Sequence, residues 1–178
     1  AMWLDADLVT SEWCPTVLKE GVFLDGRIFF DGHDDVVIGE GKEPLWMIIA
    51  DTVRSGGQCI VFVNSRRSTE SLASKHSKDM RELSPNPLSE KDVKLLEGDA
   101  DTTSFGKKLA SCVKCGVAFH NAGLTYTQRR YVEDAFRRGD IKCIFATPTL
   151  AAGINLPARR VIVRDTGRFE SNSGYSPI

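Results

Sequence analysis

The segment 143–157, CIFATPTLAAGINLP, combines the residue types of an anion-binding site where a strand meets a helix. The apolar run at its start predicts a buried strand, and Thr147 followed by Pro148 predicts the cap and first position of a short helix. Free backbone N–H groups and the partial positive charge at a helix N-terminus favour phosphate, and the hydroxyls of Thr147 and Thr149 add donors. The segment therefore predicts a phosphate contact.

Two further residues of this segment have chemistry that suits a ligand. Gly153 permits close approach of a ligand to the backbone, and the amide of Asn155 both donates and accepts hydrogen bonds. Taken alone, the segment also fits an ordinary capped turn without a ligand.

A second strand with a polar end is predicted in the segment 59–68, CIVFVNSRRS. The run 60–63 is apolar, β-branched and aromatic, as in strands that are buried on both faces. Asn64 and Ser65 follow where the strand ends, and we expect Arg66 or Arg67 to lie near the same edge.

The segment 116–124, GVAFHNAGL, repeats this arrangement. A short strand at 117–119 is followed by His120, Asn121 and Gly123. In a parallel sheet, ligands bind outside the carboxyl ends of the strands, so the three polar strand ends would line one edge. The sequence thus predicts an α/β fold with a mostly parallel sheet, helices on both faces and a phosphate-binding edge.

The order of these segments resembles that of the second RecA-like motor domain of superfamily 2 helicases. In the terms of that family they are motif IV (59–68), motif IVa (116–124) and motif V (143–158), and the run GINLPARRVI within and after motif V is highly specific. The chain is similar to the Ski-type group, which includes archaeal DNA-repair helicases and the helicase half of polymerase theta.

The resemblance implies ATP-driven translocation on single-stranded or forked DNA, with 3′ to 5′ polarity, and duplex unwinding in DNA repair. It implies that Gly153 and Asn155 face the nucleotide cleft between two lobes. An RNA substrate stays open, because phosphate contacts barely distinguish the two nucleic acids. The residues that would contact the nucleic acid are Asn64, Ser65, Arg66, His120, Asn121, Gly123, Thr147 and Thr149.

The family's nucleotide loop, G-x-x-x-x-G-K-[ST], its acidic DExH box and its C-terminal arginine motif do not occur in the 178 residues. We therefore expect ATP and Mg to be bound mainly by a first RecA-like lobe, and these residues alone to contain no catalytic residue and to be inactive. The expected division is a connection from that lobe at 1–20, the second RecA-like domain at 21–170 and a flexible tail at 171–178.

Three other functions remain compatible with the sequence. One is a non-catalytic nucleic-acid-binding or scaffold domain with the RecA-like fold, and another is the same lobe of an RNA helicase. The third is an unrelated α/β enzyme whose strand ends bind a phosphorylated small molecule.

Turn and cap signals predict the remaining elements. Asp25 and Gly26 lie between two apolar runs and predict a hairpin over 21–30 with a type I′ turn. Pro44 opens a helix that extends to about Arg54. Further helices are predicted at 68–83, 89–97, around 105–113 and after the capping box of Thr125 and Gln128.

Composition limits the class of protein. A hydrophobic share of 42% supports a core, and no apolar run reaches the ~20 residues of a membrane span. The five cysteines are odd in number and two lie in predicted strands, so we expect free thiols in the cytoplasm, near the nucleoid in an archaeon. Cys112 and Cys115 form a C-x-x-C without a second ligand pair, so no structural metal is expected.

The net charge of -1 argues against nucleic-acid binding by bulk electrostatics. Basic residues occur as doublets, and we expect most of them to be solvated or to form local ion pairs, for instance with Glu133 and Asp134.

Overall fold

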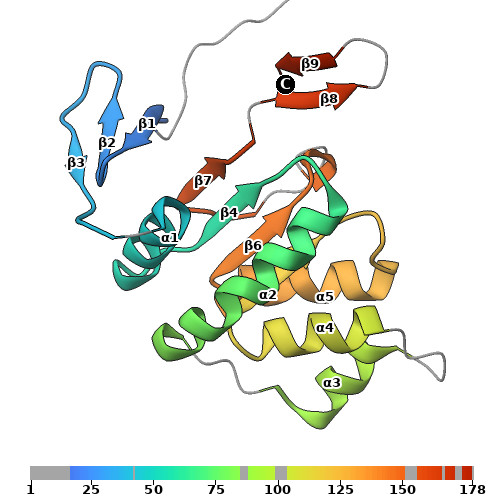
Figure 1. Ribbon diagram of the computed structural model, residues 1–178. Helices are drawn as coiled ribbons and strands as arrows, with labels where there is room; N and C mark the ends of the chain where they lie inside the picture. Colours follow the sequence, from blue (N-terminus) through green and yellow to red (C-terminus); the bar gives the residue numbers. More distant parts are fainter. Residues whose placement is uncertain are drawn as a thin grey trace, which may run out of the picture. The chain divides into compact units, whose positions relative to one another are not determined.

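The computed structural model describes residues 17–41, 43–84, 88–98, 104–150, 156–165, 167–170 and 174–177 (Figure 1). The chain divides into two compact units, residues 1–40 and 41–178.

The first unit contains a three-stranded antiparallel sheet in which β1 (Gly21–Leu24) pairs with β2 (Arg27–Phe30), and β2 pairs with β3 (Val36–Val37). Asp25 and Gly26 both have positive φ, 45° and 79°, as a type I′ turn requires. The predicted hairpin and its turn residues are therefore confirmed.

The second unit is built on a parallel sheet with the strand order β5-β6-β4-β7. Every residue of β5 and β6 is buried, which agrees with the continuous apolar runs that predict them. The edge strand β7 alternates half-buried and exposed residues and is not among the predicted elements. The strands are β4 (Cys59–Phe62), β5 (Val117–His120), β6 (Cys143–Ala146) and β7 (Arg160–Val163).

The first two helices of this unit begin at residues that suit a helix start. Helix α1 (Pro44–Arg54) has proline at its first turn and begins where the sequence predicts. Helix α2 (Arg66–Leu83) begins two residues before the predicted position, because the Ser65 hydroxyl accepts the N–H of Ser68 at 3.1 Å and caps the helix.

Two of the next three helices open with a capping box. Ser89 and Asp92 form one before α3 (Glu90–Glu97), and Thr125 and Gln128 form the predicted one before α5 (Tyr126–Arg137). Helix α4 (Ser104–Val113) lies between them in sequence and packs against α3 and β5. All three predicted helices are confirmed.

The helices cover both faces of the sheet, as predicted. The connection from β4 to β5 carries α2, α3 and α4, and the connection from β5 to β6 carries α5 and runs in the opposite direction along the sheet (Figure 1). Because parallel crossovers are right-handed, α5 lies on the face opposite α2 and α4. The largest side chains of the core between these layers are Phe119, Phe136 and Phe145.

His76 of α2 is part of this core. Its ring stacks between Trp46 of α1 and Phe145 of β6, with centroid separations of 5.6 and 5.7 Å. Burial lowers the pKa of His76, and the nearby Glu43 carboxylate opposes this effect. The ring is therefore packed between two aromatic side chains, and its burial disfavours the protonated form.

Two further segments contain short elements. The short helix expected after Thr147 is, within the described residues, the 3-10 turn Pro148–Leu150. Residues 174–177, in the segment predicted as a flexible tail, form β9 (Gly174–Pro177), which pairs antiparallel with β8 (Gly167–Glu170).

Candidate nucleic-acid interface

Three strand ends meet at the carboxyl edge of the parallel sheet. Phe62 and His120 both pair in register with Ala146. The Val63 N–H donates to the Ala146 carbonyl at 2.9 Å, and the Thr147 N–H donates to the His120 carbonyl at 3.2 Å. The polar residues that follow the three strands therefore lie along one edge, as the sequence predicts.

The end of β4 presents exposed polar groups at this edge. Asn64, Ser65 and Arg66 are all exposed. The Asn64 N–H donates to Asp165 Oδ2 at 3.1 Å, which ties this strand end to the end of β7. The Ser65 hydroxyl caps α2 and lies 2.7 Å from the Ser68 hydroxyl. A phosphate at this position would meet the first turn of a helix of 18 residues.

The end of β5 has a tighter arrangement, because its polar side chains are bonded to the protein. Asn121, 1% exposed, donates from Nδ2 to Thr69 Oγ1 at 2.8 Å and accepts the Gly123 N–H at Oδ1, also at 2.8 Å. These bonds fasten the loop after β5 to the first turn of α2. A phosphate would have to compete with them for the same donors.

His120 faces α5. Its Nε2 lies 3.1 Å from Glu133 Oε1, and its Nδ1 is buried with no hydrogen-bond partner within the described ranges. Burial lowers the pKa of His120, and the hydrogen bond to Glu133 acts in the opposite direction. A neutral ring that donates from Nε2 satisfies the carboxylate and leaves Nδ1 as an acceptor.

At the end of β6, Pro148 opens the 3-10 turn Pro148–Leu150 at the predicted helix start, and the following residues 151–155 lie outside the described ones. The turn 148–150 spans three residues, and the Thr147 hydroxyl pairs with the Thr149 hydroxyl at 2.9 Å instead of capping a backbone N–H. The Leu150 N–H donates to the Thr147 carbonyl at 3.0 Å, as in a 3-10 turn, so the Thr147 hydroxyl does not act as the predicted cap. Gly153 and Asn155, the predicted nucleotide-cleft residues, lie outside the described residues.

A cavity of about 300 Å³ lies between the ends of β5 and β6 and the first turns of α5. Three residues of its lining, His120, Asn121 and Thr149, belong to the predicted contact set. Its lining consists of His120, Asn121, Ala122, Tyr126, Arg129, Arg130, Glu133 and Thr149.

Sequence reasoning missed the contribution of α5 to this cavity. The doublet Arg129 and Arg130 was visible in the sequence as a basic signal, but nothing assigned it to a site. The predicted local ion pair of Asp134 is present, with Arg137 at 2.8 Å, whereas Glu133 pairs with His120 across the cavity wall. The number of residues between His120 and Glu133 in the sequence does not show that their side chains form such a pair.

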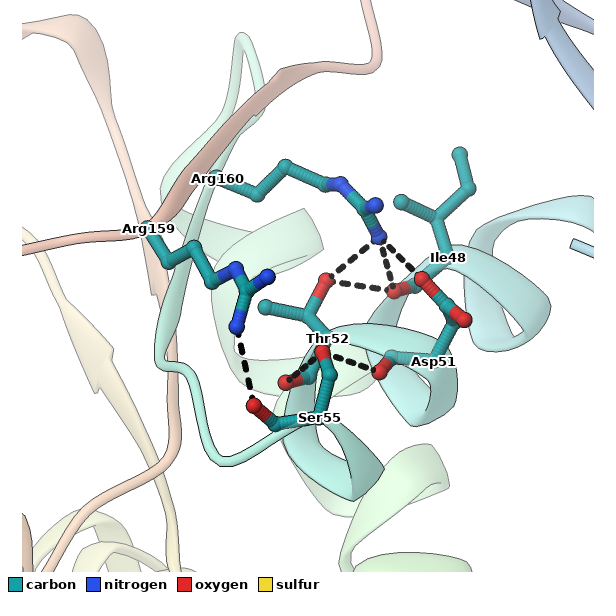
Figure 2. A network of polar contacts seen from close by, with 6 residues as sticks. All are labelled: Ile48, Asp51, Thr52, Ser55, Arg159 and Arg160. Carbon is teal, nitrogen blue, oxygen red and sulfur yellow. Dashed lines mark hydrogen bonds and ion pairs between the residues drawn. The ribbon is translucent and has the colours of Figure 1, made fainter. Parts of the chain in front are cut away.

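The doublet of Arg159 and Arg160 lies at the opposite end of the sheet. Arg160 pairs in register with Cys59, the first residue of β4, and its guanidinium donates to α1 (Figure 2). Arg159 donates to the Ser55 carbonyl at 2.8 Å. These two arginines therefore connect β7 to α1 and are remote from the carboxyl edge.

Cys112 lies in helix α4 and Cys115 lies just after it. Cys112 is buried and Cys115 half-buried, both as free thiols, and burial raises the pKa of Cys112. In the ranges that the structure describes, no group of three or more His, Cys, Asp or Glu side chains is placed to hold a metal ion. No helix there is long and apolar enough to cross a membrane.

A parallel sheet with helices on both faces, and polar strand ends gathered at its carboxyl edge, defines an α/β domain of the kind that binds phosphate-containing ligands. Residues 43–173 match the family described as "Helicase conserved C-terminal domain". The chain belongs to this family, and the expected RecA-like fold is confirmed.

Curated relatives cover the whole chain. The ATP-dependent DNA helicase Hel308 of Methanocella arvoryzae is 48% identical over 183 residues, which cover 100% of this chain and 24% of that protein. The protein of the same name from Pyrobaculum calidifontis is 45% identical, over 100% of this chain and 25% of its own length. The chain thus spans about a quarter of these relatives, and the predicted similarity to archaeal DNA helicases is confirmed.

Proposed function

We propose that the chain is the C-terminal motor lobe of an ATP-dependent DNA helicase of the Ski-type group. The observation that carries the proposal is the meeting of motifs IV, IVa and V at one sheet edge, in a chain that is similar over its whole length to proteins named DNA helicases. All three motifs include the end of a strand of one parallel sheet, and each places polar residues at its carboxyl edge.

The lobe holds single-stranded DNA by its phosphates along this edge. Ser65 and Arg66 are exposed at the start of α2, and Thr149 lines the cavity beside β5. Asn64, His120, Asn121, Gly123 and Thr147 complete the proposed contact set. Because the contacts go to phosphates, binding is largely independent of base sequence.

The described residues do not provide the groups that hold a nucleoside triphosphate with Mg. They contain no cluster of metal-binding side chains, and the sequence has no nucleotide loop. In the proposed helicase these groups are bound mainly by a first RecA-like lobe, with Gly153 and Asn155 facing the cleft between lobes. The present lobe contributes the phosphate-binding edge, which shifts relative to the first lobe by about one nucleotide per ATP cycle. In the proposed helicase this movement is 3′ to 5′ and unwinds duplexes during DNA repair.

A chimera tests the proposal. The chain replaces the matching 24% of the Methanocella arvoryzae relative, and ATP hydrolysis is measured with and without single-stranded DNA. We expect DNA-stimulated hydrolysis and unwinding of a duplex with a 3′ overhang, and a parallel series with RNA measures substrate preference. A chimera that binds ATP but is never stimulated by DNA would contradict the motor function.

A further inference from the structure

The cavity at the start of α5 has an aromatic wall in addition to its basic and hydroxyl groups. Tyr126, the first residue of α5, lines the cavity and keeps 67% of its surface exposed. Core packing therefore does not account for the position of this ring. Its apolar face is accessible to a ligand at the carboxyl edge of the sheet.

Arg130 holds the Tyr126 ring in place. Its Nη1 donates to the Tyr126 hydroxyl at 3.3 Å, and its guanidinium carbon lies 6.0 Å from the ring centroid, within the range of a cation–π contact. These two contacts restrict an otherwise solvated side chain. Restriction before binding lowers the entropy cost of ordering the ring against a ligand.

The same cavity has an excess of positive charge. Arg129 is half-buried in its wall and forms no ion pair with any residue of the described ranges. The carboxylate of Glu133 also lines the cavity, where it lies 3.1 Å from His120 Nε2. The two arginines of the lining outnumber its one carboxylate, which favours a phosphate beside Arg129.

Resting on the proposed function, we propose that Tyr126 is a stacking platform for one base of the bound single strand, and that Arg129 binds the phosphate of the same nucleotide. The cavity volume of about 300 Å³ is at the lower end for ligand sites and suits part of one nucleotide. Every base has a π-face, so stacking of this kind adds affinity without base preference, in agreement with phosphate contacts elsewhere along the edge.

The first test uses the chimera that shows DNA-stimulated ATP hydrolysis. Stacking of a base on an aromatic side chain contributes to affinity, so Tyr126→Ala should weaken binding of a single-stranded oligonucleotide by about 5- to 10-fold. Tyr126→Phe keeps the ring and should stay within about 2-fold of the parent. Thr127→Ala, at the exposed neighbouring position outside the cavity lining, is the matched control and should leave affinity unchanged.

Abasic oligonucleotides separate stacking from other roles of the tyrosine. A single abasic site is moved along the strand, and at one position the loss from Tyr126→Ala should largely disappear, because the stacked base is already missing. Arg129→Gln should instead reduce the slope of log affinity against log salt by about 1, whereas Tyr126→Ala should leave the slope unchanged.

The outcomes distinguish this inference from the proposed function. Stimulated hydrolysis together with unchanged affinity of the Tyr126→Ala chimera would overturn the stacking role and leave the motor function intact. A loss that is equal for every abasic position would also overturn it. A chimera that never binds DNA would overturn both.

Discussion

Arg160→Ala removes the central contact of the polar network in Figure 2. The Arg160 Nη1 donates to Asp51 Oδ2 at 2.7 Å, to Thr52 Oγ1 at 2.9 Å and to the Ile48 carbonyl at 3.4 Å. The Arg160 side chain is 25% exposed and that of Asp51 is 34% exposed. The network connects β7, the last strand of the parallel sheet, to helix α1.

The expected loss follows from these contacts. Hydrogen bonds to charged groups contribute about 1.5–3 kcal/mol each when well formed, whereas exposed ion pairs contribute about 0–1 kcal/mol. Water reaches Asp51 once the arginine is truncated, so the contributions do not add in full. We expect the free energy of unfolding to fall by about 1.5–2.5 kcal/mol, which lowers the Tm of a chain of this size by about 3–10 °C.

Urea unfolding of the 178-residue chain measures this loss. Arg159→Ala is the matched control, because within the described residues the exposed Arg159 side chain makes one hydrogen bond, to the Ser55 carbonyl, so its loss should not exceed about 0.5 kcal/mol. Arg160→Lys keeps the charge without the planar fork and should recover part of the stability. Equal losses for Arg159→Ala and Arg160→Ala would refute this account of the network.

Three other predictions concern separate parts of the second unit. In the chimera, Ser65→Ala and Thr147→Ala should each weaken binding of single strands of any sequence by ~0.5–1.5 kcal/mol, and unchanged affinity in both would remove them from the contact set. Because burial lowers the native pKa of His76 below its ordinary 6.5, the free energy of unfolding should fall as the pH drops from 6.5, and His76→Phe should reduce that decline in urea titrations at several pH values. At Gly106 an added Cβ would lie 2.5 Å from the Glu97 carbonyl oxygen, so Gly106→Ala should destabilise the chain by about 1–3 kcal/mol, and an unfolding midpoint equal to the parent's would argue against this close approach of α3 and α4.

Elements fixed by short-range chemistry were predictable from the sequence. Asp25 and Gly26 tolerate the two positive φ angles of a type I′ turn. The spacing of Thr125 and Gln128 predicts a capping box without any tertiary information. The apolar runs of β4, β5 and β6 likewise predict buried strands. β7 was not predicted; its half-buried and exposed residues alternate, and two arginines precede its apolar run.

The sequence by itself determined the fold class, the family and which strand ends carry polar groups, because each apolar run and its polar end lie within a few residues of one another and the order of these segments is visible along the chain. Only the tertiary structure decided how the polar groups are used. Asn121 is bonded to Thr69, 52 residues away, and Arg160 is bonded to Asp51, 109 residues away. The cavity likewise needs β6 to pair beside β5, which brings Thr149 next to the residues after β5 and at the start of α5.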